Sequence, residues 1–329
     1  MQQSRNHWLG AILLVGLLSL TAQWPSVAKA EEAKAVAAAQ TAQTQTMSNA
    51  GFAERGAETC MKCHDEPPVT NILHTAHAQR ADSRTPFAAH DCESCHGASP
   101  EHLVKPAEGA KRAEPMIVFG AHSPTPVAEQ NKSCMQCHQG GLRMAWTGSQ
   151  HQRSDLACAT CHTIHATKDP VLAKKTQPEV CVSCHVTQRA QMYRFSHHPI
   201  KEGKVVCSNC HNPHGSFGPT LLVKTSVNET CYQCHAEKRG PFLWEHAPVR
   251  EDCTNCHTPH GAAQPRLLKI RAPYLCQTCH MWQFHPSTLY EGADIPPNGA
   301  DQHLLAKGCL NCHSMIHGSN HPSGIRFMR

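Results

Sequence analysis

The sequence is poor in aromatic residues and gives little sign of a conventional hydrophobic core. Phe, Trp and Tyr make up 5% of its 329 residues and are outnumbered by 23 prolines. A chain of this length ordinarily folds around one or two cores of apolar side chains. Something that the chain binds must therefore supply much of the interior.

Long apolar runs are absent beyond the N-terminus. Arg5, the short apolar run from Leu9 to Leu20 and the triplet Ala28-Lys29-Ala30 predict a secretory signal peptide over residues 1–30, with an uncleaved anchor as the alternative. Residues 31–50 are rich in Ala, Gln and Thr, which predicts a flexible leader. We expect residues 51–329 to form one exported domain with no direct membrane span.

Clustered basic residues are lacking as well. The formal charge is +5, and Arg5 and Lys29 are lost with the signal peptide. The remaining Lys and Arg are scattered along the chain, which argues against a nucleic-acid interface.

No cysteine falls outside one repeated motif. All 20 cysteines belong to ten copies of C-x-x-C-H. This is the attachment sequence of c-type haem, in which two thiols add to the porphyrin vinyl groups and the histidine binds the iron as proximal ligand. The cysteine pairs are Cys60 and Cys63, Cys92 and Cys95, Cys134 and Cys137, Cys158 and Cys161, Cys181 and Cys184, Cys207 and Cys210, Cys231 and Cys234, Cys253 and Cys256, Cys276 and Cys279, and Cys309 and Cys312. The proximal histidines are His64, His96, His138, His162, His185, His211, His235, His257, His280 and His313.

Zinc ribbons, redox C-x-x-C pairs and a secreted disulfide framework are the competing interpretations of paired cysteines. A histidine directly after all ten pairs favours haem c over each of them, because histidine is only 27 of 329 residues. Ten haems leave too few residues for separate pockets. The sequence therefore predicts a multihaem cytochrome c: mostly coil with short α-helices, little or no β-structure, and an elongated wire of packed haems. The scattered Lys and Arg then become partners for haem propionates.

A second set of histidines recurs after every second motif, which indicates a two-haem repeat. These histidines lie too close to the preceding proximal ligand to reach the opposite face of the same porphyrin. We predict that each is a distal ligand of a neighbouring haem. They are His102, His165, His214, His260 and His317.

Five further distal ligands are expected upstream of these motifs. The candidates are His77, His151, His198, His246 and His285. Two alternatives stay open, His197 in place of His198 and His303 in place of His285. We interpret His74, His90, His122 and His321 as surface or supporting histidines, and the ten methionines as packing residues, because none recurs at a fixed place in the repeat.

Several longer phrases resemble the periplasmic decahaem c-type cytochromes of the MtrA/DmsE family. They are CESCHGASPEH, SPTPVAEQNKSCMQCH, HNPHG, CHAEKRGPFLWEHAPVREDC and CLNCHSMIHGSNHPSG. The resemblance implies an electron-transfer protein of the periplasm with ten bis-histidine haems, inserted into a porin-like outer-membrane β-barrel. It also implies periplasmic or inner-membrane cytochrome donors and a surface cytochrome or terminal reductase as partners.

Two other functions remain open from sequence. A soluble periplasmic electron shuttle would use the same haems without a barrel. A multihaem reductase would need an iron with a free coordination position, whereas every motif here ends in histidine and enough histidines remain to saturate each iron. We therefore expect no enzymatic activity. The direction of electron flow does not follow from the sequence.

Overall fold

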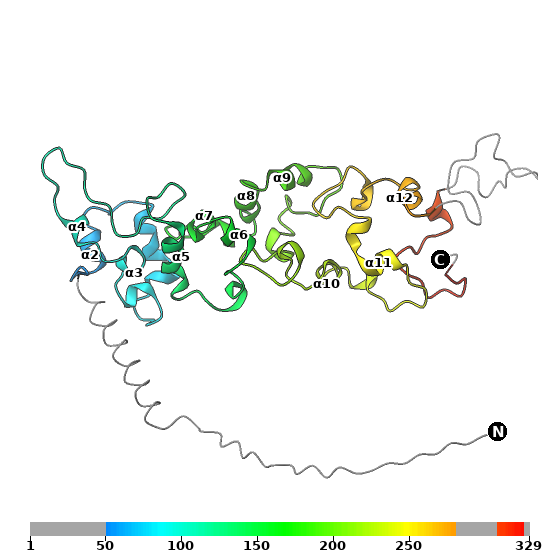
Figure 1. The fold of residues 1–329 in the computed structure, drawn as a ribbon, viewed down its shortest axis with the longest axis horizontal. Helices are drawn as coiled ribbons and strands as arrows, with labels where there is room; N and C mark the ends of the chain where they lie inside the picture. The colour runs from blue at the N-terminus through cyan, green and yellow to red at the C-terminus, as the bar shows by residue number, and fades with distance from the viewer. Residues whose placement is uncertain (1–50, 281–307, 326–329) are drawn as a thin grey trace, which may run out of the picture. The chain divides into compact units, whose positions relative to one another are not determined.

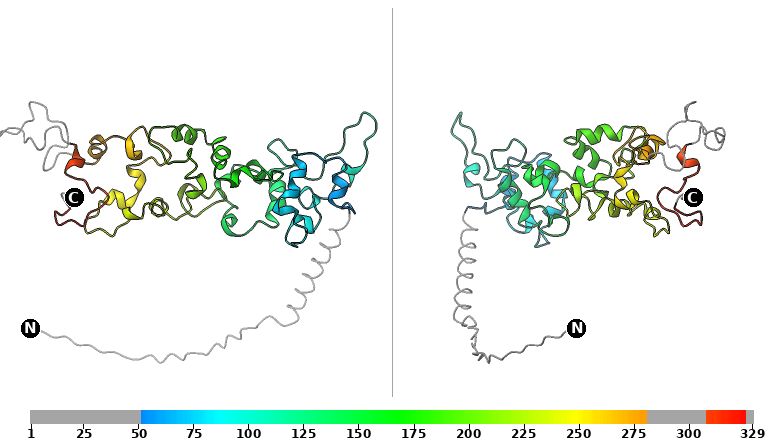
Figure 2. Two further views of the ribbon diagram at one scale, coloured as in Figure 1. Left: turned by 180° about the vertical axis from the view of Figure 1, so that it is seen from behind. Right: turned by 45° about the vertical axis from the view of Figure 1, so that its right-hand side comes forward.

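The computed structural model describes residues 51–280 and 308–325. Short helices joined by irregular segments run through these ranges, as the coloured ribbon in Figure 1 and both views of Figure 2 show. No strand forms within them, and their only sheet-like pairings are isolated β-bridges such as His211 with Leu222 and His257 with Leu268. The expected fold of coil and short helices is confirmed. The predicted signal peptide and leader lie outside the described residues.

The described α-helices are short, and the longest has nine residues. They are α2 (Ala57–Cys60), α3 (Glu93–His96), α4 (Pro100–Leu103), α5 (Val127–Met135), α6 (Gln150–Arg153), α7 (Cys158–Cys161), α8 (Gln177–Val182), α9 (Val186–Met192), α10 (Val227–Cys231), α11 (Ala247–Glu251) and α12 (Tyr274–Gln277). The 3₁₀ helices are η1 (Val69–His74), η2 (Ala76–Ala78), η3 (Pro86–Ala88), η4 (Gly141–Arg143), η5 (Pro170–Leu172), η6 (Cys207–Asn209), η7 (Pro219–Leu221), η8 (Ala236–Lys238), η9 (Cys253–Asn255), η10 (Pro265–Leu267) and η12 (Cys309–Asn311).

The attachment motifs are placed relative to the short helices in two ways. In one kind a helix leads into the first cysteine: α10 begins after Ser226, whose hydroxyl accepts a hydrogen bond from the Glu229 N–H, and ends at Cys231. In the other kind the helix begins at the first cysteine, as η9 does after Asp252 caps it. Short polar side chains favour these starts because they accept hydrogen bonds from the first free N–H groups.

Buried amide side chains join neighbouring motifs. The Asn228 carboxamide oxygen accepts a hydrogen bond of 2.8 Å from the backbone N–H of Cys253, and its NH₂ donates to the Val249 and Arg250 carbonyls. Asn131 occupies the equivalent place before Cys134 and accepts from the Cys158 N–H at 2.7 Å. Each asparagine thus holds the helix of one motif against the start of the next.

Within residues 51–280 and 308–325, buried apolar side chains pack in small clusters. Ala57, Ile72 and Phe87 form one, and Val182, Met192 and Ile200 form another. By contrast, Phe217 and Met144 are 95% and 75% exposed. Side-chain packing alone therefore buries little apolar surface in the described part of the chain, and none of its helices has the length and apolar character needed to cross a membrane.

Candidate haem attachment and axial ligand sites

Each C-x-x-C-H motif is closed by the same backbone hydrogen bond. In all ten copies the histidine N–H donates to the carbonyl of the first cysteine, at 2.8 to 3.1 Å. This is one helical turn, and residues three apart in such a turn lie on the same face. The two thiols therefore stand together, with the histidine just beyond them, as covalent attachment of one porphyrin requires.

Motifs that follow one another in the sequence are also neighbours in space. The first-cysteine thiols of Cys60 and Cys92 are within hydrogen-bonding reach, and this contact lowers the pKa of the Cys60 thiol to about 7. The same contact joins Cys134 with Cys158, Cys181 with Cys207, Cys231 with Cys253, and Cys276 with Cys309. Between these pairs, electrostatic interactions link the second cysteines, Cys95 with Cys137, Cys161 with Cys184, Cys210 with Cys234, and Cys256 with Cys279.

Nine proximal histidines face a second histidine from elsewhere in the chain. The ring centroids of all nine pairs lie between 5.9 and 6.3 Å apart. The pairs are His64 with His102, His96 with His165, His138 with His77, His162 with His214, His185 with His151, His211 with His260, His235 with His198, His257 with His317, and His280 with His246.

The separation of about 6 Å leaves room for one metal ion between the rings. Two imidazole nitrogens that share a metal ion each lie roughly 2 Å from it, which puts the ring centroids about 6 Å apart. Rings in direct contact lie closer: His90 stacks on Phe52 with centroids 3.8 Å apart. The nine pairs therefore have the spacing of axial ligands, and His90 does not.

The pairing interlocks successive repeats. A histidine that follows a motif pairs with a proximal histidine two motifs earlier, as His260 does with His211. A histidine that precedes one motif pairs with the proximal histidine of the next motif along the chain. His246, for example, precedes the motif at Cys253 and pairs with His280 of the motif at Cys276. At the N-terminal end this rule has no earlier motif to use, and His102 turns back to His64 instead.

One hexapeptide serves three of these sites. In CHTPHG, residues 256–261, His257 pairs with His317 and His260 pairs with His211. Between them, the Pro259 carbonyl accepts a hydrogen bond of 2.7 Å from His198 Nδ1. The carbonyl of Pro213 in the related peptide CHNPHG accepts in the same way from His151.

Glycine at the end of this peptide is required by a close backbone approach. A Cβ on Gly261 would lie 2.0 Å from the Gln191 carbonyl oxygen, and φ of Gly261 is +154°. Gly215 in the related peptide meets the Ala145 carbonyl in the same manner, with φ of +107°. Only a residue without a side chain fits these two places.

Hydrogen bonds fix the ring orientation of several paired histidines. Nδ1 of His96, His211 and His257 faces the carbonyl oxygen of Ile117, Thr220 and Arg266, at 3.0, 2.9 and 2.8 Å respectively. A carbonyl only accepts, so Nδ1 carries the proton and Nε2 is left with a free lone pair for a metal.

Burial keeps many of the paired imidazoles neutral. Burial is the main cause of a lowered pKa at seven of these histidines, because the charged imidazolium is poorly solvated there. The histidines concerned are His96, His138, His165, His214, His246, His260 and His317. A neutral imidazole is the form that binds iron.

The structure separates the two adjacent histidines that the sequence left open. His198 is the member whose ring faces His235, at 6.3 Å. His197 Nδ1 instead faces the Arg194 carbonyl, and its Nε2 lies 3.3 Å from Glu202. His285 and its rival His303 fall outside the described residues, so the pair predicted for His313 is not described.

The attachment motifs, read together with known proteins, identify the family. Over 281 residues the chain is 45% identical to the multiheme cytochrome MtrA of Shewanella baltica, an alignment that covers 84% of this chain and 83% of that protein. The chain belongs to the MtrA family of multihaem c-type cytochromes. It also shares 38% identity over 66 residues with the cytochrome c-type protein NrfB of Escherichia coli O6:H1, covering 19% of this chain and 35% of that one.

Three family descriptions match segments of this MtrA-family chain. The doubled CXXCH motif matches residues 197–240 and 246–285, the NrfB-like cytochrome c-type protein family matches 92–178, and the cytochrome c554 and c-prime family matches 19–97. Together these similarities confirm a multihaem electron-transfer protein with covalently attached haem c. The zinc, dithiol and disulfide interpretations of the cysteines are therefore excluded.

The side chains around the ligand pairs suit haem in two respects. Buried Arg143 Nε has no hydrogen-bond partner among the described residues, while the Arg143 charge acts on both His138 and His214. A propionate of a haem in this MtrA-family protein would satisfy it. Arg80 and Arg250 form ion pairs with Asp91 and Glu245 of the chain itself. Propionate partners for the other Lys and Arg remain a prediction.

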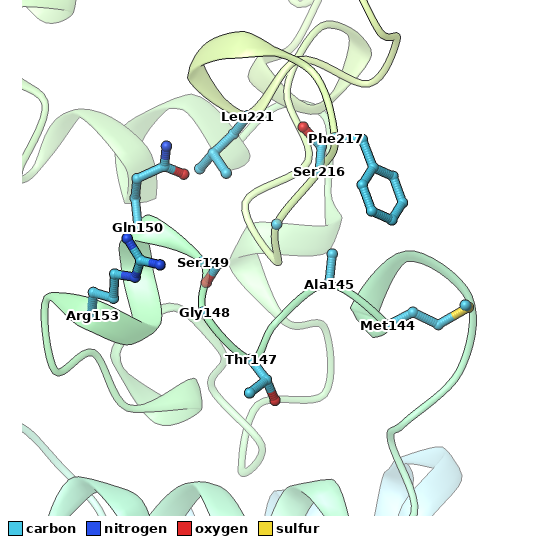
Figure 3. A pocket seen from close by; sticks show the side chains of 11 residues that line it. Met144, Ala145, Thr147, Gly148, Ser149, Gln150, Arg153, Ser216, Phe217 and Leu221 are labelled. Atoms are coloured by element: carbon cyan, nitrogen blue, oxygen red, sulfur yellow. The ribbon is translucent and has the colours of Figure 1, made fainter.

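Apolar groups near His214 also suit a porphyrin. A hollow of about 390 Å³ lies between the N-terminal end of α6 and the loop that follows His214. Figure 3 shows the side chains that line it. Its lining includes apolar Met144, Phe217 and Leu221 beside polar Thr147, Gln150 and Arg153. Met144 and Phe217 are exposed there, which favours their burial against another apolar surface.

Proposed function

We propose that this MtrA-family protein carries electrons between periplasmic donors and the cell exterior through an outer-membrane porin-like β-barrel. Its place would be the periplasm, bound to the outer membrane through that barrel. Periplasmic or inner-membrane cytochromes would act at one end, and a surface cytochrome or terminal reductase at the other. The same assembly would serve either direction of flow, since the potentials of the partners decide it.

The observation that carries the proposal is the unbroken order of the attachment motifs. From Cys60 to Cys309, each motif lies near the one before it. The first cysteines of five motif pairs are within hydrogen-bonding reach, and between these pairs the second cysteines lie near enough to act on each other electrostatically. Haem c supplies one-electron redox chemistry when attached. A chain that holds ten attachment motifs in series suits transport over distance better than chemistry at one site.

The axial ligands belong to the same proposal. We assign the nine histidine pairs, with His285 for His313, as the iron ligands. This assignment gives every iron two imidazoles and leaves no coordination position for a substrate, so we propose no enzymatic activity. His/His ligation also favours lower potentials than His/Met ligation.

The test is reconstitution. Outer membranes would be solubilised and the protein pulled down through a C-terminal tag, and a co-purified β-barrel would be inserted with it into liposomes that hold an oxidised redox dye. We expect external dithionite to reduce the enclosed dye only when both proteins are present. Failure of a barrel to co-purify, or an unreduced dye when both proteins are present, would favour the soluble shuttle.

Two measurements on the isolated protein check the remaining parts. Intact mass should report ten covalent haems, and a count well below ten would contradict the ligand assignment. Electron paramagnetic resonance (EPR) of the oxidised protein should show low-spin iron alone. A high-spin ferric signal would instead support the reductase alternative.

A further inference from the structure

One proximal histidine donates its Nδ1 proton to a charged acceptor. His162 Nδ1 lies 2.6 Å from the Asp169 carboxylate oxygen Oδ2, and the Asp169 side chain is only 12% exposed. The proximal histidines at the same place in the next two repeats, His211 and His257, donate to backbone carbonyls. The acceptor at His162 therefore carries a full negative charge where theirs is neutral.

The local sequence explains the difference. Asp169 precedes Pro170, and the matching residues before proline in the later repeats are Gly218 and Gln264. In those repeats the residue after the proline has a positive φ, +49° at Thr220 and +60° at Arg266, and this residue supplies the carbonyl that meets the histidine.

The first of these repeats has no such backbone turn. Val171, in η5, is not among the positive-φ residues, and a side chain takes over the role of the carbonyl.

The Asp169 carboxylate is held in place by the backbone. Its Oδ1 accepts hydrogen bonds from the N–H groups of Val171 and Thr163, at 3.3 and 3.2 Å, which leaves Oδ2 for His162. Within the described residues, no Lys or Arg forms an ion pair with Asp169 to neutralise this charge. The geometry is that of a carboxylate–histidine–metal triad, in which the carboxylate raises the basicity of the ligating nitrogen.

We propose that Asp169 is a positioning residue that lowers the reduction potential of the haem attached at Cys158 and Cys161. The inference rests on the proposed ligand pair His162 and His214. A more basic Nε2 and a nearby, largely buried negative charge both favour the ferric over the ferrous iron. The proton stays on His162 Nδ1 in both redox states, so the only charge exchanged is the single electron taken from the reductant.

The chain offers a matched control. Glu237 Oε1 lies 3.9 Å from Nδ1 of the proximal histidine His235, beyond hydrogen-bonding distance, and both side chains are more than half exposed. Glu237→Gln therefore removes one carboxylate beside a proximal histidine without removing a hydrogen bond to it. Charged groups exposed to this extent interact weakly through water.

The experiment uses the holoprotein with ten haems, verified by intact mass. Wild type, Asp169→Asn, Asp169→Glu and Glu237→Gln would be titrated with dithionite while absorbance and EPR are recorded. For Asp169→Asn we expect about one tenth of the haem signal to become easier to reduce by roughly tenfold, equivalent to about 59 mV for one electron. One low-spin EPR signal should change its g values at the same time.

Asp169→Glu should keep most of the wild-type behaviour, and Glu237→Gln should shift the titration much less than Asp169→Asn. Overlapping titrations of wild type and Asp169→Asn, or equal shifts in Asp169→Asn and Glu237→Gln, would overturn the proposal. If Asp169→Asn attaches fewer haems, the test passes to Asp169→Glu. The proposal then requires a small change in the g values of that one low-spin EPR signal in Asp169→Glu, and a spectrum identical to that of the wild type would overturn it. None of these measurements needs a β-barrel, so they can fail while the proposed function holds. Failure of the proposed function itself would be seen in the liposome assay with the wild-type protein.

Discussion

His260 faces His211 with ring centroids 6.0 Å apart and ring planes 16° apart, although the two belong to different attachment motifs. His260 follows its own proximal histidine, His257, by three residues. A turn that short cannot carry it around the porphyrin attached beside it. The second histidine of the C-x-x-C-H-x-x-H phrase therefore joins one repeat to an earlier one, and the ligand assignment can be tested histidine by histidine.

Replacing His198 should change one haem, whereas replacing its neighbour should not. His198→Met would exchange one proposed His/His iron for His/Met, which raises the reduction potential. His197→Met is the control, because His197 contacts Arg194 and Glu202 and lies outside the ligand pairs. The measurement is a reductive titration of both variants. A raised potential in His197→Met with none in His198→Met would reverse the assignment of this site.

Gly261→Ala should destabilise the junction between repeats. The added methyl group would overlap the Gln191 carbonyl oxygen, and overpacking of this kind costs about 1–3 kcal/mol. Gly140→Ala is the matched control, since φ there is −94° and no atom lies within 4 Å of the place that its Cβ would take. Thermal unfolding followed by circular dichroism should show a lower midpoint for Gly261→Ala only. Equal midpoints for both variants would contradict the close approach.

Asn228→Ala should weaken the contact between two motifs. It removes the acceptor for the Cys253 N–H and the donor to two carbonyls, all in a buried site. Leaving buried polar groups without partners costs about 1–3 kcal/mol each. The exposed Asn255, which makes a single hydrogen bond to Pro248, provides the control in Asn255→Ala. Chemical denaturation should therefore reveal a larger loss for Asn228→Ala than for Asn255→Ala.

The ring planes predict two classes of iron spectrum. Five pairs are nearly parallel, with angles of 11 to 21°, and four are strongly crossed, with angles of 53 to 80°. The relative orientation of two axial imidazoles affects how their π orbitals split the iron d orbitals. We expect two groups of low-spin signals of similar total intensity in the EPR spectrum of the oxidised protein. A single homogeneous signal would contradict the geometry.

The sequence was most informative where chemistry demands a strict local pattern. Both thiols and the proximal histidine must reach one porphyrin from a single turn, so the C-x-x-C-H motif can be recognised from the sequence alone. The same density of motifs, with few aromatic residues, predicted a fold of coil and short helices. Propionate partners for the basic side chains stay a prediction. Arg80 and Arg250 also form ion pairs with Asp91 and Glu245 of the chain itself, which the spacing of the motifs does not predict.

Sequence alone determined the family, the covalent cofactor and the histidines available as ligands, because each depends on residues a few positions apart. Only the tertiary structure decided which histidine faces which, why His198 rather than His197 meets His235, and which proximal ligand has a carboxylate behind it. Those relations join residues from different repeats, or choose between neighbours by the direction of the backbone. They depend on how the repeats pack, which spacing along the chain does not specify.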